Sequence, residues 1–139
     1  MNEGPYSLPD REDQQGCVER YEAMLTRNDH YFFDVEEFEL IIEHYLEQND
    51  PKQAQEVLRY AYEQHPGALD LMFCDAHVLM NMGRLNKALE VLDAIGKMEP
   101  FNEDVHLHKA GIYSQLRNYR RAIEHYKRAL DIAEEGIDD

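Results

Sequence analysis

The sequence predicts an all-α fold built from three consecutive pairs of helices. Three observations predict it. Side-chain character recurs with a fixed period of 34 residues over most of the 139-residue chain. Each period holds two stretches of apolar residues at helical spacing, and turn-forming residues separate these stretches.

The repeat is visible when the sequence is aligned with itself at a shift of 34 residues, because five columns keep similar side chains. Small residues allow two helix backbones to approach to about 8 Å, so the column that holds only alanine predicts closely packed helices. The columns are Ala54, Ala88 and Ala122; Leu58, Leu92 and Tyr126; Tyr45, Leu79 and Tyr113; Ile42, Ala76 and Ala110; and Ala61, Ile95 and Ala129.

Capping residues predict where the helices of the first unit, residues 35–68, begin. Asp34 precedes the first helix and Glu37 follows three residues later, an arrangement typical of a capping box. Asp50 can cap the second helix, with Pro51 in its first turn, where the missing N–H of proline costs nothing. The predicted inward-facing residues are Phe38, Ile41, Ile42 and Tyr45, then Ala54, Val57, Leu58 and Ala61.

The second and third units, residues 69–102 and 103–136, repeat this plan. Gly83 is placed to end the first helix of the second unit, and Asn102 and Asn118 can cap the two helices of the third. The residues that line the predicted helices of the second unit are Met72, Ala76, Leu79, Leu85, Ala88, Leu92 and Ile95. In the third unit, the first helix carries Leu107, Ala110 and Tyr113, and the predicted inward-facing residues of the second are Ala122, Tyr126, Ala129 and Leu130.

This pattern resembles the tetratricopeptide repeat, in which an aromatic residue, Leu-Gly and Tyr precede an alanine, an aromatic residue and a proline. The resemblance covers residues 35–136, with Asp75 and Lys109 departing at a position that is usually apolar. It implies a right-handed α–α superhelix, or α-solenoid, whose first helices line a concave groove. HEAT and armadillo repeats are disfavoured, because their period is about 40–47 residues.

The segment before the repeats has a different character. Residues 1–13 are polar, with Pro5 and Pro9, and predict a flexible acidic tail. Residues 14–34 predict an amphipathic helix that caps the first unit, followed by a connection whose aromatic residues dock on the core. The residues involved are Val18, Tyr21, Met24 and Leu25 in the helix, and Tyr31, Phe32 and Phe33 in the connection.

Composition excludes several classes of partner. The net charge is −15, which repels nucleic acid and anionic membrane surfaces. No apolar run approaches the roughly 20 residues that span a bilayer, and the first 15 residues lack the features of a signal peptide. These features predict a cytoplasmic protein with no nucleic-acid partner and no membrane contact. Cys17 and Cys74 are too few for a disulfide framework.

No pattern of residues predicts catalysis, a cofactor or a metal site. His106 and His108 are two apart and lie on different faces of a helix, whereas a zinc-binding helical pair has a spacing of four. The sequence contains no phosphate-binding glycine loop and no nucleophile motif. We therefore expect a non-catalytic protein that binds another protein or a peptide.

The resemblance places a set of side chains in the concave groove. Its first-unit end is acidic, which disfavours the acidic chaperone tails that some family members bind and favours a basic or amphipathic segment, with Phe73 as the main apolar contact. The candidate binding residues are Glu36, Glu39, Glu43, Glu47, Asp70, Phe73, His77, Met80, Asn81, Asp104, Leu107, Gly111 and Ser114.

An alternative is a structural module that acts through contacts between repeats. No polar-faced capping helix follows the third unit in this sequence, and solenoids need such caps to stay soluble. The open C-terminal edge therefore predicts either self-association or a longer array of repeats. Basic residues near the last helix could meet an acidic surface of another copy.

Overall fold

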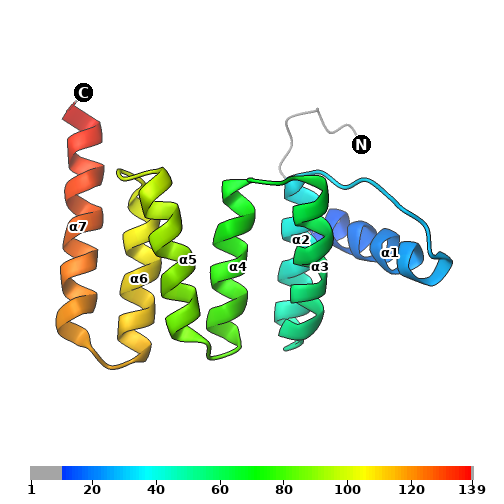
Figure 1. The fold of residues 1–139 in the computed structure, drawn as a ribbon, viewed down its shortest axis with the longest axis horizontal. Coiled ribbons are helices and arrows are strands. Elements are labelled where there is room, and N and C mark those ends of the chain that lie inside the picture. Colours follow the sequence, from blue (N-terminus) through cyan, green and yellow to red (C-terminus); the bar gives the residue numbers. More distant parts are fainter. Residues whose placement is uncertain (1–10, 139) are drawn as a thin grey trace. The chain divides into compact units, whose positions relative to one another are not determined.

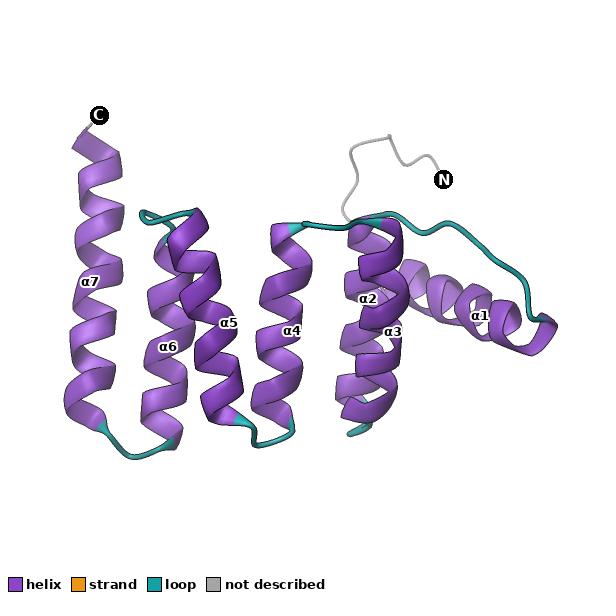
Figure 2. Cartoon of the chain, viewed as in Figure 1, coloured by secondary structure: helices purple, strands orange, loops and turns teal. Residues whose placement is uncertain are grey.

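The computed structural model describes residues 11–138, and most of the predicted tail lies outside the described residues. Helices dominate this part of the chain, and it contains no strand (Figures 1 and 2). The helices are α1 (Arg11–Arg27), α2 (Val35–Glu47), α3 (Pro51–Gln64), α4 (Leu69–Asn81), α5 (Leu85–Met98), α6 (Glu103–Gln115) and α7 (Tyr119–Asp138). The predicted all-α helical repeat fold is confirmed. The chain divides into two compact units between Leu71 and Met72.

The first unit is built on α2, which packs against both α1 and α3. The predicted capping box is present, since the Glu37 N–H donates to Asp34 Oδ1 at 2.8 Å and the Asp34 N–H donates to Glu37 Oε1 at 3.0 Å. Asp50 accepts a hydrogen bond from the Gln53 N–H at 3.2 Å. The largest fully buried side chains of this unit are Tyr21, Phe33, Phe38, Ile41, Leu71 and Val57.

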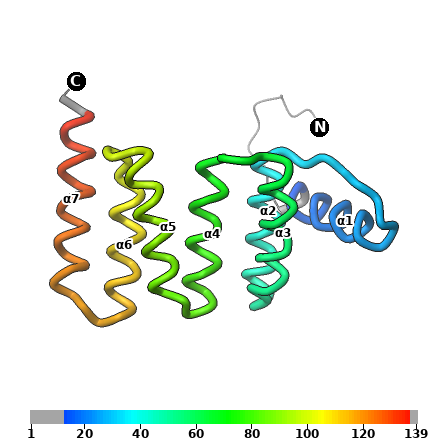
Figure 3. Tube along the Cα trace, in the orientation of Figure 1, coloured from blue at the N-terminus to red at the C-terminus, as the bar shows by residue number. Residues whose placement is uncertain are grey.

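The connection between α1 and α2 returns along α1 to the start of α2 (Figure 3). Side chains at the end of α3 hold it in place. Gln64 accepts from the Phe33 N–H at 3.0 Å and donates to the Tyr31 carbonyl at 2.7 Å, and His65 Nε2 lies 2.7 Å from the Phe33 carbonyl. Of the three aromatic residues predicted to dock, Phe33 is buried and Tyr31 half-buried, whereas Phe32 is exposed.

In the second unit, α6 packs against both α5 and α7. Gly83 has φ of 76°, a conformation that favours glycine, and the Arg84 N–H donates to the Leu79 carbonyl at 2.9 Å just after α4. The predicted asparagine caps are present, because Asn102 accepts from the Asp104 N–H at 2.9 Å and Asn118 from the Arg121 N–H at 3.2 Å.

Two residues predicted to face inward on α7 are exposed instead. Tyr126 is 49% exposed and Leu130 58%, whereas Ala122 and Ala129 on the same helix are buried. Within residues 11–138, α7 is the last helix, and only α6 packs against it through more than isolated contacts. The inward face of α7 is therefore formed by Ala122, Ala129 and Ile132.

Candidate protein-binding surface

The predicted binding residues all lie on α2, α4 and α6, and most of them are accessible. In the first unit, Glu36, Glu43, Glu47 and Asp70 are exposed and Glu39 is half-buried. In the second unit, the exposed residues are His77, Asn81, Asp104 and Leu107, and the half-buried ones are Phe73, Met80, Gly111 and Ser114. None of the thirteen is fully buried, so none serves only as core.

The carboxylates of Glu36, Glu39, Glu43 and Glu47 form one surface, which we name the acidic face of α2. Their spacing of three and four residues places them together, opposite the buried stripe of the same helix. Among the described residues, none of these carboxylates forms an ion pair. By contrast, Glu37 pairs with Arg20 of α1 at 3.1 Å. The acidic face of α2 therefore carries uncompensated negative charge.

The environment of Glu39 shows how close these charges lie. Partial burial raises the pKa of its carboxyl above the usual value, and the neighbouring charges of Asp70, Glu36, Asp34 and Glu43 raise it further. Because each of these neighbours disfavours the ionised form of Glu39, a bound cation would relieve repulsion at this position. Among these charges, that of Asp70 at the start of α4 raises the pKa of Glu39 most.

In the second unit, α4 and α6 approach each other through the predicted apolar residues. The rings of Phe73 and His108 lie 5.2 Å apart. A Cβ atom built on Gly111 would lie 3.9 Å from Met80 Cε. Part of the Phe73 and Met80 side chains is thus committed to packing between helices, while Leu107 remains 43% exposed. Leu107 is consequently the more accessible apolar contact.

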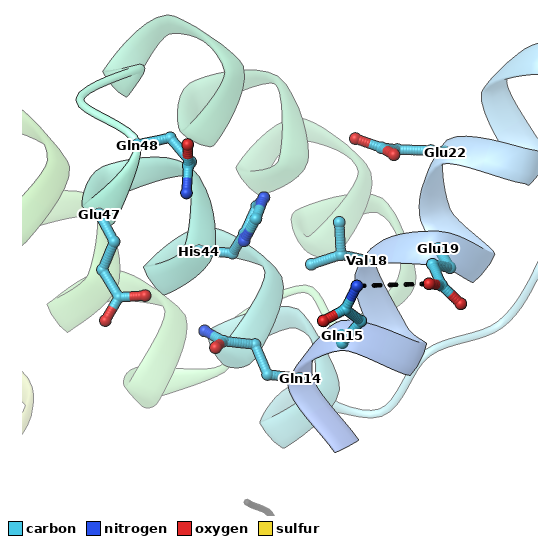
Figure 4. Close-up of a pocket in the computed structure, with 8 residues that line it drawn as sticks. All are labelled: Gln14, Gln15, Val18, Glu19, Glu22, His44, Glu47 and Gln48. Carbon is cyan, nitrogen blue, oxygen red and sulfur yellow. Dashed lines mark hydrogen bonds between the residues drawn. The ribbon is translucent and has the colours of Figure 1, made fainter. Parts of the chain in front are cut away.

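A cleft of about 430 Å³ between α1 and α2 continues the acidic surface, and the sequence did not indicate it (Figure 4). Glu47 lines this cleft together with Glu19 and Glu22 of α1. Glu22 accepts a hydrogen bond from the Tyr45 hydroxyl at 2.8 Å, and Gln15 donates to Glu19 at 3.5 Å. The remaining lining residues are Gln14, Val18, His44 and Gln48. The walls are mainly polar.

A histidine pair in the second unit was also missed by the sequence. His106 Nδ1 of α6 lies 3.0 Å from His125 Nδ1 of α7, and the ring of Tyr113 stacks on His125 with centroids 5.5 Å apart. Partial burial lowers the pKa of both histidines, and the charge of Lys109 lowers both further. No group of three metal-ligating side chains is found in the described part of the chain.

This pair predicts a pH-dependent stability of the second unit. Folding lowers the pKa of both imidazoles below 6.5, so near this pH the unfolded chain binds more protons than the folded chain. A fall in pH therefore favours the unfolded chain. We expect the melting temperature to fall between about pH 6.5 and pH 5, where a hydrogen-bonded pair must acquire charge. His125→Gln should flatten this slope, measured by thermal melts at several pH values. The exposed His30 provides a control, and His30→Gln should keep the wild-type slope.

Comparison with known families identifies the class of this repeat fold. Two models described as tetratricopeptide repeat match the chain, one at residues 45–112 and the other at residues 103–135. The chain belongs to the tetratricopeptide repeat family, whose fold is a module for protein–protein interaction. The resemblance inferred from the 34-residue period is thereby confirmed.

Individual relatives share parts of the chain. Cell division cycle protein 27 homolog A of Arabidopsis thaliana is 36% identical over 58 residues, which are 42% of this chain and 8% of that protein. The solved structure of YrrB, a tetratricopeptide repeat protein with an unusual peptide-binding site, has a TM-score of 0.69 at 22% identity, covering 88% of this chain and 61% of YrrB. A structure of MamA has a TM-score of 0.65 at 20% identity, covering 91% and 70%. These likenesses support the fold.

No helix in the described residues is both long and apolar enough to cross a bilayer.

Proposed function

We propose that this chain binds a basic, amphipathic segment of another protein through the first helices of its repeats. The acidic face of α2 is the observation that carries the proposal. Four carboxylates lie there without an ion-pairing partner among the described residues, and partial burial together with the acidic neighbours raises the pKa of Glu39. A ligand with lysine or arginine side chains would offset this repulsion. YrrB offers a precedent for peptide binding by this fold.

In the second unit, apolar side chains of a bound segment would meet the surface of α6. Leu107 is exposed on this helix, while Phe73 of α4 presents only the part of its ring that His108 leaves free. Apolar contacts supply most of the affinity in helix-in-groove recognition, and charges mainly set the association rate. We therefore expect the acidic face of α2 to orient the ligand and set its association rate, and Leu107 to contribute to the affinity for its apolar side chains.

A random peptide library displayed on phage provides a direct test. The chain should enrich peptides that combine lysine or arginine with apolar residues, and their binding should weaken as salt rises. For an enriched peptide, Glu39→Lys with Glu43→Lys should slow association by about tenfold or more, as expected when a steering charge is reversed. Leu107→Gln should speed dissociation. Stopped-flow fluorescence separates the two rates.

A matched variant controls for net charge. Glu63→Lys with Glu90→Lys makes the same change in charge at exposed positions on α3 and α5, and it should bind the peptide nearly as the wild type does. Enrichment of acidic peptides would contradict the proposal. Equal slowing by both charge reversals would show that net charge alone steers binding, not the acidic face of α2.

A further inference from the structure

The last of the described helices carries an apolar stripe that is about half exposed or more. Tyr119, Ile123, Tyr126 and Leu130 follow one another at spacings of four, three and four residues, so they lie on one face of α7. They are 60%, 53%, 49% and 58% exposed. We name them the α7 stripe. Its spacing is that of the contact positions in a two-helix coiled coil.

The corresponding face of α5, 34 residues earlier in the sequence, shows that a neighbouring helix packs against such a stripe. There Leu92, which corresponds to Tyr126, is fully buried. A Cβ atom on Gly96 would lie 3.7 Å from Val105 Cγ1 of α6, and Asp93 pairs with Lys109 of α6 at 2.6 Å. The next helix along the chain thus covers α5 on this face. The α7 stripe is the equivalent surface for the packing of another helix.

We propose that the α7 stripe packs against the α7 stripe of a second copy of this chain, with the two α7 helices antiparallel. The distribution of charge along α7 indicates that the partner is a second α7 helix and that the two helices run antiparallel. Residues 119–128 contain four basic side chains and one acid, Glu124. Residues 129–136 contain three acids and no base. An antiparallel pair brings each basic half beside an acidic half, whereas a parallel pair would bring like charges together.

The charged residues beside the α7 stripe are placed so that a two-fold symmetric pair would bring opposite charges together. At 100° per residue, Arg120, Lys127, Asp131 and Glu134 all lie on the same side of the α7 stripe, away from α6. In an antiparallel pair related by a two-fold axis, this side of one helix meets the same side of the other in reverse order. The interface is closed and uses α7, so it is independent of the ligand-binding surface proposed on the first helices.

Sedimentation equilibrium of the full chain over a concentration series tests the interface. The wild type should show a monomer–dimer equilibrium, and Ile123→Gln with Leu130→Gln should raise the dissociation constant by about tenfold or more, as for residues at an interface centre. Met98→Gln with Phe101→Gln removes two apolar side chains of similar exposure from the end of α5 and the turn after it, and should leave the equilibrium unchanged. A wild-type chain that stays monomeric overturns the proposal.

Charge reversal tests the antiparallel direction. Arg120→Glu with Lys127→Glu makes this side of α7 entirely acidic, and Asp131→Lys with Glu134→Lys makes it entirely basic. Each variant alone should dimerise more weakly than the wild type, and an equimolar mixture should form a heterodimer more tightly than either variant pairs with itself. If the wild type dimerises but the mixture gains no affinity, the antiparallel arrangement is wrong. Circular dichroism confirms that each variant is folded.

Discussion

Replacing Ala88 with arginine is expected to unfold much of the second unit. Ala88 is fully buried on α5, in the column that holds alanine in every repeat. An arginine there adds volume to a packed core, which typically costs about 1–3 kcal/mol. It also buries a charge with no partner arranged to receive it, which adds several kcal/mol. The total is comparable with the whole stability of an ordinary domain, about 5–15 kcal/mol.

The matched control lies on the same helix. Ala94 is exposed, so Ala94→Arg adds the same side chain without burying it and should change stability by no more than about 0.5 kcal/mol. Thermal melts followed by circular dichroism compare the two variants, and hydrogen exchange shows whether protection is lost in α5–α7. Similar melting temperatures for both variants would mean that the register of the helix pairs is wrong.

The caps and the core of the repeats could be predicted from sequence because they depend on nearby residues. The Asp34–Glu37 capping box needs only a spacing of three, and the left-handed turn at Gly83 needs only a glycine at the end of a helix. Burial of Ala54, Ala88 and Ala122 follows from their shared column. In each case the signal is a fixed and short distance along the chain.

The contacts that were missed join residues without a fixed period. His106 and His125 meet across α6 and α7 at a separation of 19 residues, and Gln64 reaches back 33 residues to the Tyr31 carbonyl. The exposure of Tyr126 has another cause. A repeat column predicts the type of side chain at a position, but the column says nothing of whether a neighbouring helix is present to bury it.

Only part of the candidate binding surface could be predicted, because the sequence shows spacing within a helix but not contacts between helices. Helical spacing was enough to place Glu36, Glu43 and Glu47 on one exposed face. It could not show that Phe73 packs on His108, because that contact depends on the distance between α4 and α6. The boundaries of the groove and its ligand remain predictions that the peptide selection tests.

Tyr21→Ala should cause the largest loss of stability in the first unit. Tyr21 is fully buried on α1, and its ring lies 5.9 Å from that of Tyr60 on α3, 6.3 Å from Tyr45 on α2 and 6.4 Å from Phe33. This side chain is therefore a central contact between α1 and the repeats, beside the Arg20–Glu37 ion pair and the Tyr45–Glu22 hydrogen bond. Truncating a large buried aromatic residue to alanine costs about 3–5 kcal/mol, and the tilted and edge-on ring contacts would be lost in addition.

Tyr21→Phe separates the ring from its hydroxyl. The buried Tyr21 hydroxyl has no hydrogen-bond partner among the described residues, and burial raises the pKa of this group. Removing a buried polar group that lacks a partner relieves its desolvation cost, so Tyr21→Phe should be neutral or stabilising by about 1 kcal/mol. Chemical denaturation of both variants measures the difference. A wild-type midpoint for Tyr21→Ala would show that α1 does not hold the first unit together, and a strong loss in Tyr21→Phe would show that the hydroxyl finds a partner in solution.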